Sequence, residues 1–378
     1  MNETKKPAIR FQGFSDEWEQ RKLGEVGAVF MCRRIFKEQT SESGDIPFYK
    51  IGTFGGEADA FISRELFEEY KAKYPYPQKG DILISASGSI GRTVEFTGKN
   101  EYFQDSNIVW LNHDERLINS FIKCFYSVVK WSGIEGSTIK RLYNEHILNT
   151  VINMPSVIEQ QRIGDFFKQL DHLITLHQRK CEKLQTFKKS MLVKMFPQNG
   201  AEMPEVRFKG FTDVWEQRKL NEIVSYVSSH LSAKDAQENG LYDLYDANSV
   251  IGKTDVAPIP KEYISIIKDG AGVGRIRILP KNSLFIGTMG GLLADNSDLN
   301  FVYALLSRFS LGNESSGSTI PHIYFKDYGS NEYYVPAFEE QKTIGAYFTN
   351  LDNLITLHRQ QLDKLKSIKK ALLEKMFV

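Results

Sequence analysis

The residues best suited to chemistry in this sequence are basic side chains and serines on or near glycine-rich turns. The first half contains Arg33, Arg34, Lys37, Lys50, Ser87, Ser89, Arg92 and Lys99, and the second contains Lys253, Arg275, Arg277 and Lys281. Arginine and lysine contact phosphates and guanine edges, and serine hydroxyls add donors and acceptors. The pattern predicts a distributed DNA-contacting surface, and for each residue an ordinary solvated surface charge is an equally good interpretation.

Enzyme motifs are matched only in part. Residues 251–254 resemble the end of a P-loop, but Ala247 stands where the first glycine is required, so a turn is predicted there. Residues 270–274 resemble part of a dinucleotide fingerprint that lacks its last glycine, and their counterpart is 87–91. Both runs predict tight loops between strands. Such a loop lets backbone approach a DNA phosphate, and a plain hairpin loop is the alternative interpretation.

The elements that must position these residues are repeated along the chain. The openers 7–26 and 204–223 share the run WEQRKL, and residues 155–196 return as 336–377 with LITLH in both copies. Trp18 and Trp215, at matching points, are interpreted as packing anchors. Such a repeat identifies a tandem duplication. The openers and the long repeated segments match, whereas the sequences between them differ. We therefore expect two globules of one architecture that recognise different targets.

Each repeated segment from 155 and from 336 is predicted to form one long helix. Its seam positions alternate in spacings of four and three, as in helices that pack by knobs into holes. These positions are Ile163, Phe167, Leu170, Ile174, His177, Cys181 and Leu184, then Ile344, Phe348, Leu351, Ile355, His358, Leu362 and Leu365. Each helix would be about 55–60 Å long. Two such helices are expected to pack on each other.

Polar residues of these helices are given structural interpretations. His177 and His358 are expected to fix the register of the seam in preference to acting as ligands or bases. The pairs Lys188–Lys189 and Lys369–Lys370 are expected to be a solvated face that complements the helix dipole. The seven histidines form no ligand-spaced cluster, so no metal site is predicted.

The predicted fold class is α+β, with two mixed α/β domains in tandem separated by two long antiparallel coiled-coil helices in a pseudo-two-fold arrangement. The expected divisions are 1–155, a spacer helix at 156–197, a shorter second globule at 198–336 and a C-terminal spacer helix at 337–378. Strands are predicted at 81–86 and 91–96 because these runs are rich in β-branched residues. Residues 196–206, with two prolines and a glycine, are predicted to be a linker.

Composition adds limits. The chain has 378 residues, 41% of them hydrophobic, and a formal net charge of +1. That charge neither favours nor excludes DNA. The charged start is unlike a signal peptide, no apolar run is long enough to span a membrane, and three scattered cysteines give no disulfide framework. A reducing cytoplasm is the expected location.

With these motifs together, the whole chain resembles the specificity subunit of type I restriction–modification systems. The resemblance is carried by the two WEQRKL openers, the GSTI stretches leading to Glu159-Gln160 and Glu340-Gln341, and the two LDxLITLH helices. It implies two target-recognition domains that each recognise half of a bipartite double-stranded DNA site. It implies two methyltransferase subunits docked around the helices and globules, with motor–nuclease subunits joining for cleavage. S-adenosylmethionine, ATP and Mg would belong to those partners, and this chain would bind no cofactor.

Two other functions compete with this one. A stand-alone DNA-binding regulatory protein would lack stable association with a methyltransferase. A single-chain methyltransferase–nuclease would need cofactor and nuclease motifs that are not found in the sequence.

Overall fold

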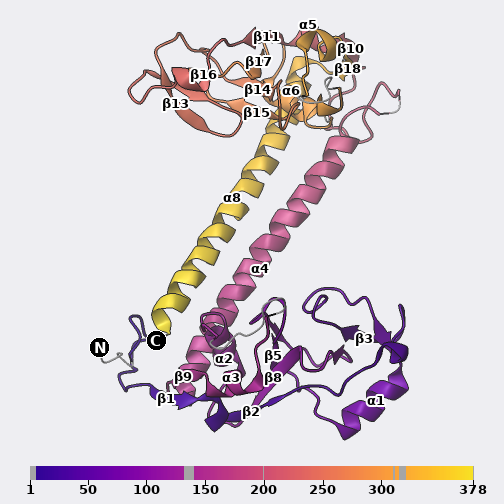
Figure 1. Ribbon diagram of the computed structural model, residues 1–378. Coiled ribbons are helices and arrows are strands. Elements are labelled where there is room, and N and C mark those ends of the chain that lie inside the picture. Colours follow the sequence, from indigo (N-terminus) through magenta and orange to yellow (C-terminus); the bar gives the residue numbers. More distant parts are fainter. Residues whose placement is uncertain (1–5, 132–139, 199, 310, 315–320, 378) are drawn as a thin grey trace. The chain divides into compact units, whose positions relative to one another are not determined.

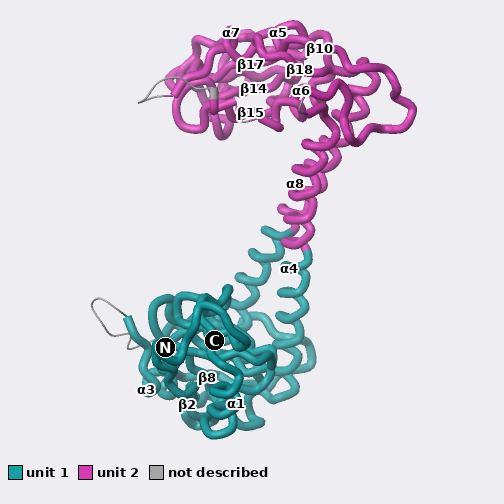
Figure 2. The backbone as a smooth tube through the Cα atoms, turned by 90° about the vertical axis from the view of Figure 1, so that its right-hand side faces the viewer, with its two compact units in different colours: residues 1–176, 362–378 teal, residues 177–361 magenta. Residues whose placement is uncertain are grey.

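The computed structural model describes residues 6–131, 140–198, 200–309, 311–314 and 321–377. These residues form two compact units, which Figure 2 distinguishes by colour. Unit 1 comprises residues 1–176 and 362–378, and unit 2 comprises 177–361. Each unit therefore contains one globule together with parts of both long helices, α4 (Val157–Lys194) and α8 (Phe338–Met376). The two predicted helices and the α+β class are confirmed.

The globule of unit 1 contains nine strands and several short helices among its described residues. Its strands are β1 (Glu19–Lys22), β2 (Gly27–Phe30), β3 (Ile46–Tyr49), β4 (Phe61–Ile62), β5 (Ile82–Ser85), β6 (Thr93–Glu95), β7 (Tyr102–Phe103), β8 (Ile108–His113) and β9 (Val151–Met154). Its helices are η1 (Leu23–Glu25), η2 (Lys37–Gln39), α1 (Arg64–Lys73), α2 (Asn119–Tyr126) and α3 (Asn144–Asn149) (Figure 1).

The globule of unit 2 repeats this arrangement. Its strands are β10 (Glu216–Lys219), β11 (Ser225–Ser228), β12 (Tyr242–Tyr245), β13 (Val250–Thr254), β14 (Tyr263–Ile267), β15 (Ile276–Leu279), β16 (Ser283–Phe285), β17 (Met289–Leu293) and β18 (Glu332–Val335). Its helices are α5 (Leu220–Ile223), η3 (Ala233–Asp235), α6 (Leu299–Leu306), η4 (Leu311–Glu314) and α7 (Phe325–Tyr328).

The described residues of each unit form three sheets, and the strand order is the same in both. Unit 1 has the pair β1–β9, the four-stranded order β2-β8-β5-β6 and the three-stranded order β4-β3-β7. Unit 2 has β10–β18, β11-β17-β14-β15 and β13-β12-β16. The predicted hairpin is present in both, since β5 pairs antiparallel with β6 and β14 pairs antiparallel with β15. The duplication inferred from the openers and helices therefore extends through the divergent centres.

Two local predictions from turn residues are wrong. Residues 251–254 are not a turn but part of strand β13, where Lys253 and Thr254 pair with Asp243 and Tyr242 of β12. This run pairs with β12 in an antiparallel ladder, although the register shifts between Leu244 and Tyr245, and this pairing outweighs the local glycine signal. The supposed linker starts too early, because Phe196 is buried in the core of unit 2.

The tryptophans anchor equivalent cores, as predicted. In unit 1, Trp18 is buried and packs edge-on to Phe121 and Phe377, with ring centroids 6.0 and 6.1 Å away. In unit 2, Trp215 packs on Phe301 and Phe196 in the same way, at 6.2 and 6.1 Å. The phenylalanine after each long helix therefore closes the core of a globule.

The repeated Glu-Gln pair at the start of each long helix joins it to its globule. Glu159 receives two hydrogen bonds from Arg10, at 2.6 and 2.7 Å, and Glu340 receives two from Arg207, both at 2.7 Å. The neighbouring Gln160 accepts from the backbone N–H of Ile118 at 3.0 Å. Buried polar groups require such partners. These hydrogen bonds therefore explain why the Glu-Gln pair stands in both copies.

The seam prediction is confirmed within each unit, where the helices lie antiparallel. Nδ1 of His177 lies 3.1 Å from Nδ1 of His358 in unit 2, and one ring can donate to the other. The lysine prediction is partly wrong. Lys188 binds Asp352 in unit 2 at 2.6 Å, and Lys369 binds Asp171 in unit 1 at 2.5 Å, instead of both being solvated. Within the described residues, no helix is long and apolar enough to cross a membrane.

Candidate nucleic-acid interface

Four segments of unit 1 converge at the turn end of the β5–β6 hairpin. They are the loop after β3, the hairpin turn itself, the segment between β7 and β8, and the segment after β2 that contains Arg34. Ser87 donates to Oδ1 of Asn107 at 2.7 Å, Arg34 pairs with Asp105 at 2.9 Å, and the N–H of Ile51 donates to Gln104 at 2.9 Å. Loops gathered at the end of a rigid sheet are common sites of binding.

The hairpin turn itself needs glycine. Gly88 and Gly91 have φ values of 63° and 83°, in the left-handed region that glycine adopts at low cost. Arg92 follows, and its guanidinium lies against Gly55 in the loop after β3, where an added Cβ would come 3.2 Å from Nη2. The predicted residues Ser87, Ser89 and Arg92 thus belong to one group of loops.

Unit 2 has the equivalent group of loops, supported by arginines. Arg275 donates to the carbonyl of Ala247 at 2.6 Å and to Oδ1 of Asn248 at 2.8 Å. Arg277 donates to the carbonyl of Asn248 at 2.7 Å, and its guanidinium stacks 5.3 Å over Tyr245. Both predicted arginines therefore hold the loop between β12 and β13. Contact with DNA remains a prediction for them.

A carboxylate inside that loop is stabilised in its charged form. Asp246 accepts the backbone N–H groups of Ser249 and Asn248, each at 2.7 Å. The Ser249 hydrogen bond is the main cause that lowers the pKa of Asp246 below its ordinary value, with Arg277 and Arg275 adding attraction. Asp246 is therefore charged at neutral pH, and its carboxylate accepts both hydrogen bonds from the backbone of the loop.

Other predicted residues lie away from these loops or have other partners. Lys99 follows β6 and Lys281 follows β15, so each lies at the end of its hairpin opposite the turn. Lys253, in β13, faces Asp243 at 4.0 Å, and Lys50 pairs with Asp59 at 2.8 Å. Arg33 stacks over Tyr74 at 5.2 Å, whereas Lys37 lies in η2.

Several polar residues of the loop groups were missed by reasoning from sequence. They are Asp105, Asn107 and Arg141 in unit 1, and Asp246, Asp269 and His322 in unit 2. A signal existed for one equivalent pair, because Arg141 and His322 interrupt otherwise similar runs at 136–143 and 317–324. The repeated residues Ser137-Thr138 and Ser318-Thr319 lie outside the described residues.

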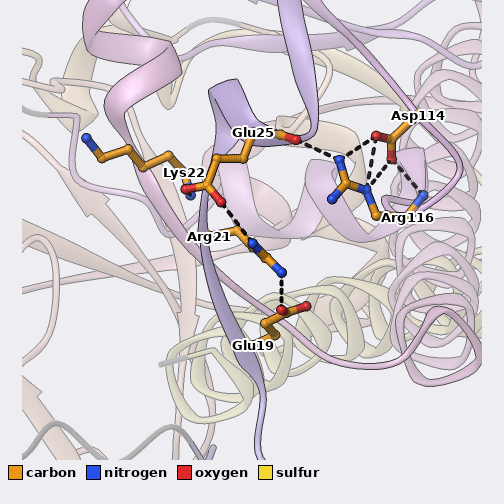
Figure 3. Close-up of polar contacts among 6 residues, drawn as sticks. All are labelled: Glu19, Arg21, Lys22, Glu25, Asp114 and Arg116. Atoms are coloured by element: carbon orange, nitrogen blue, oxygen red, sulfur yellow. Dashed lines mark hydrogen bonds and ion pairs between the residues drawn. The ribbon is translucent and has the colours of Figure 1, made fainter.

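The charged residues shared by the two openers have partners within the protein. Figure 3 shows Arg21 between Glu19 and Glu25, and Arg116 reaching the carbonyl of Glu25. The backbone N–H of Lys22 donates to Glu25 at 3.0 Å and is the largest cause that lowers the pKa of this carboxyl. In unit 2, Glu222 accepts from the N–H of Lys219 at 3.3 Å. The repeated glutamates Glu25 and Glu222 therefore accept the backbone N–H at the start of η1 and of α5.

Two repeated leucine pairs have no such internal role. Leu173 and Leu176 of α4 are 43% and 40% exposed, and their equivalents Leu354 and Leu357 of α8 are 45% and 48% exposed. All four lie outside the hydrophobic clusters formed by the described residues. Leucines three residues apart lie on one helix face, so each unit presents the same small apolar ridge. Ridges of this kind mark protein–protein contacts when they adjoin other apolar surface.

Metal-ligating clusters are not formed by the described part of the chain: no group of three or more His, Cys, Asp or Glu side chains is placed to bind an ion. Cys32, Cys124 and Cys181 are free and buried. Burial raises the pKa of both Cys32 and Cys124 to about 12. The Cys32 and Cys124 thiols are therefore neutral and unreactive at physiological pH.

A family model and the curated relatives below all belong to type I restriction systems. The family model described as "Type I restriction modification DNA specificity domain" matches residues 15–186 and 212–367. A putative type I restriction enzyme specificity subunit, S.HindORF215P of Haemophilus influenzae, is 59% identical over 157 residues, which are 40% of this chain and 41% of that protein. The MjaVIII specificity subunit of Methanocaldococcus jannaschii is 24% identical, over 78% of this chain and 74% of its own.

Solved structures are similar in fold. The crystal structure of a type I restriction–modification S subunit from M. genitalium has a TM-score of 0.71 at 18% identity, and the match covers 99% of each chain. A chain from a study of complex assembly and conformational transition in the type I system has a TM-score of 0.51 at 16% identity, over 95% of this chain and 97% of its own.

Proposed function

Because the chain belongs to the type I restriction–modification DNA specificity family, we propose that its two units each recognise one half of a bipartite double-stranded DNA target. The chain is the DNA-recognition subunit of such a system and is itself non-catalytic. The family match does not favour an independent regulatory protein. We propose that it binds DNA in the cytoplasm, where its DNA target would be.

One observation carries the division into two half-sites. Both units have the same sheet order, and the same loops meet at the hairpin turns, yet these loops carry different side chains. Base edges are distinguished by the pattern of donors and acceptors offered to them. Two units with the same sheets and different loops fit the recognition of two different DNA sequences. The shared sheets fix the geometry of the loops, and the loop side chains determine which bases are recognised.

Catalysis is assigned to partner subunits. We propose that two methyltransferase subunits bind this chain and that motor–nuclease subunits join them for cleavage. S-adenosylmethionine, ATP and Mg would be bound by those partners. The near-neutral net charge of +1 is compatible with DNA binding if the partners supply many of the phosphate contacts.

The leucine ridges are the surfaces we propose for the methyltransferase subunits. The repeated arginines and glutamates of the openers pair with one another, whereas the repeated leucines remain exposed. An outside constraint explains why both copies keep them, and a surface present twice fits two copies of one partner. Burying an exposed leucine side chain stabilises a complex by about 1–2 kcal/mol.

Aspartate substitutions test this docking surface. Leu173→Asp with Leu176→Asp should remove one methyltransferase subunit from the purified complex, and the same change at Leu354 and Leu357 should remove the other. The exposed Gln178 supplies the matched control, Gln178→Asp, because its side chain points about 140° from Leu173 and about 160° from Leu176 around the helix. Mass measurement of the complex gives the stoichiometry. Two bound methyltransferases in both leucine variants would exclude the ridges as docking sites.

A loop exchange tests the proposed function as a whole. Residues 27–135 are replaced by those of a relative, in a host that carries the partner subunits. Genome-wide sequencing of methylated DNA should show a change in one half-site, with the other half-site and the gap between them unchanged. A change in both halves, or in the gap, would contradict the division of recognition between the units.

A further inference from the structure

Both units have the same backbone bridge beside the glycine-rich hairpin turn. Ser87 bridges Arg141 in unit 1, and Asp269 bridges His322 in unit 2. Arg141 and His322 each stand two residues before the N-cap of the next short helix, at Tyr143 and Tyr324. The backbone is thus held in the same way at a position where the side chains differ.

In unit 1 this position carries an anchored arginine. Nη2 of Arg141 donates to Ser106 Oγ at 3.1 Å and to Asn107 Oδ1 at 3.3 Å, and Ser87 also donates to that Oδ1 at 2.7 Å. Nε and Nη1 donate to none of the described residues. Ser106 has a φ of 52°, which is uncommon outside glycine and gathers at binding sites. The Nη2 end of the guanidinium is therefore fixed, and the N–H of Nε and the two of Nη1, three of its five donors, remain for a ligand.

In unit 2 the position carries a histidine fixed by a carboxylate. Nδ1 of His322 lies 2.7 Å from Oδ1 of Asp269, and both side chains are about one third exposed. A carboxylate accepts, so Nδ1 bears a proton, and in the neutral tautomer this leaves Nε2 as an acceptor. The two units thus offer opposite chemistry at one backbone position: donors from Arg141 and an acceptor from His322.

We propose that Arg141 and His322 are equivalent base-recognising residues of the two units. Arg141 contacts guanine, whose O6 and N7 accept hydrogen bonds, through an N–H of Nε or Nη1. His322, oriented by Asp269, contacts a base that presents an exocyclic amine, adenine or cytosine. This assignment rests on the proposed function, and it names residues outside the basic set predicted from sequence.

Anchoring is the property that makes these side chains suitable. A long side chain loses rotamer freedom when it binds, and a side chain already fixed in the protein loses less. Ser106 and Asn107 fix Arg141, and Asp269 fixes His322. By contrast, Lys37 lies on a short helix with no side-chain hydrogen bond to a described residue, which suits a phosphate contact better than base discrimination.

The test is a map of methylated DNA from a host that carries the partner subunits and one variant of this chain. Arg141→Lys keeps the charge but loses the fixed guanidinium donors. It should reduce the preference for guanine at one position of one half-site by about 10-fold or more. His322→Phe should relax one position of the other half-site. Arg64→Lys, on α1 of unit 1, is the control and should give the wild-type motif.

Three results would overturn the assignment. They are an unchanged motif with Arg141→Lys, a change in both half-sites, and loss of methylation at both half-sites, since the last would mark a structural role. An unchanged motif would leave the proposed function intact. A wild-type chain that directs no bipartite methylation would instead defeat the proposed function and this inference with it.

Discussion

Removing Arg10 should destabilise unit 1 far more than removing an exposed arginine such as Arg21. The Arg10 guanidinium meets the Glu159 carboxylate in a two-pronged contact at 2.6 and 2.7 Å, and the side chains are only 14% and 1% exposed. Arg10→Ala would leave a buried carboxylate without its counter-ion, at a cost of about 3–5 kcal/mol. The position of Glu159 in the first turn of α4 offsets up to about 1 kcal/mol of this.

Calorimetry combined with hydrogen exchange measures this effect. After this offset the expected loss is about 2–5 kcal/mol, which for a unit of this size corresponds to a fall in Tm of roughly 4–20 °C. Faster exchange should be confined to peptides of residues 1–176 and 362–378. Arg207→Ala, which breaks the equivalent pair with Glu340, should shift unit 2 instead.

The double variant Arg10→Met with Glu159→Met separates desolvation from attraction. Replacing a whole buried pair by apolar residues costs little, so the double variant should be more stable than Arg10→Ala alone. Arg21→Ala removes an exposed arginine of the same unit and should leave Tm nearly unchanged. A loss below about 1 kcal/mol for Arg10→Ala, or a larger loss in the double variant, would refute the reasoning.

Two further predictions concern a loop and a helix. Because the folded pKa of Asp246 is lowered, its contribution to stability is present above its ordinary value of 3.8 and is lost as the pH falls through the folded pKa. The protection factors of the Asn248 and Ser249 backbone N–H groups, that is, their exchange rates relative to the intrinsic rates at the same pH, should therefore fall at acid pH in the wild type, whereas Asp246→Asn should show no such fall. Insertion of four residues into α4, about one turn, should change the gap between half-sites in the methylated motif. An unchanged gap would show that the helices do not set the spacing.

The long helices could be predicted from sequence because each seam position repeats a local period. Ile163 and Phe167 belong to the core of unit 1, and Ile344 and Phe348 belong to that of unit 2, as their spacing indicated. No partner segment is needed to recognise such a period. The same holds for the strands of the β5–β6 hairpin, although their predicted bounds were one or two residues too wide.

The loop contacts could not be predicted, because they join residues far apart in the chain. Arg34 and Asp105 are 71 residues apart, and Arg141 and Ser106 are 35 apart. The difference between Arg141 and His322 within two similar runs marks the position, but it does not show which residues Arg141 contacts. The error at 251–254 has the same origin, because the hydrogen bonds that make it a strand come from β12. Local signals decide only where tertiary partners do not override them.

The two copies assign stability and recognition to different residues. The contacts they share are the arginine–glutamate pair, the tryptophan core, the lysine–aspartate pairs of the helices and the backbone bridge beside the hairpin. The side chains they do not share, such as Arg141 and His322, lie on loops at the ends of sheets. Substitution there removes hydrogen bonds at the surface but leaves the buried apolar contacts in place, so its effect on folding stability is small. A frame of this kind can therefore change the DNA sequence it recognises without first acquiring a more stable fold.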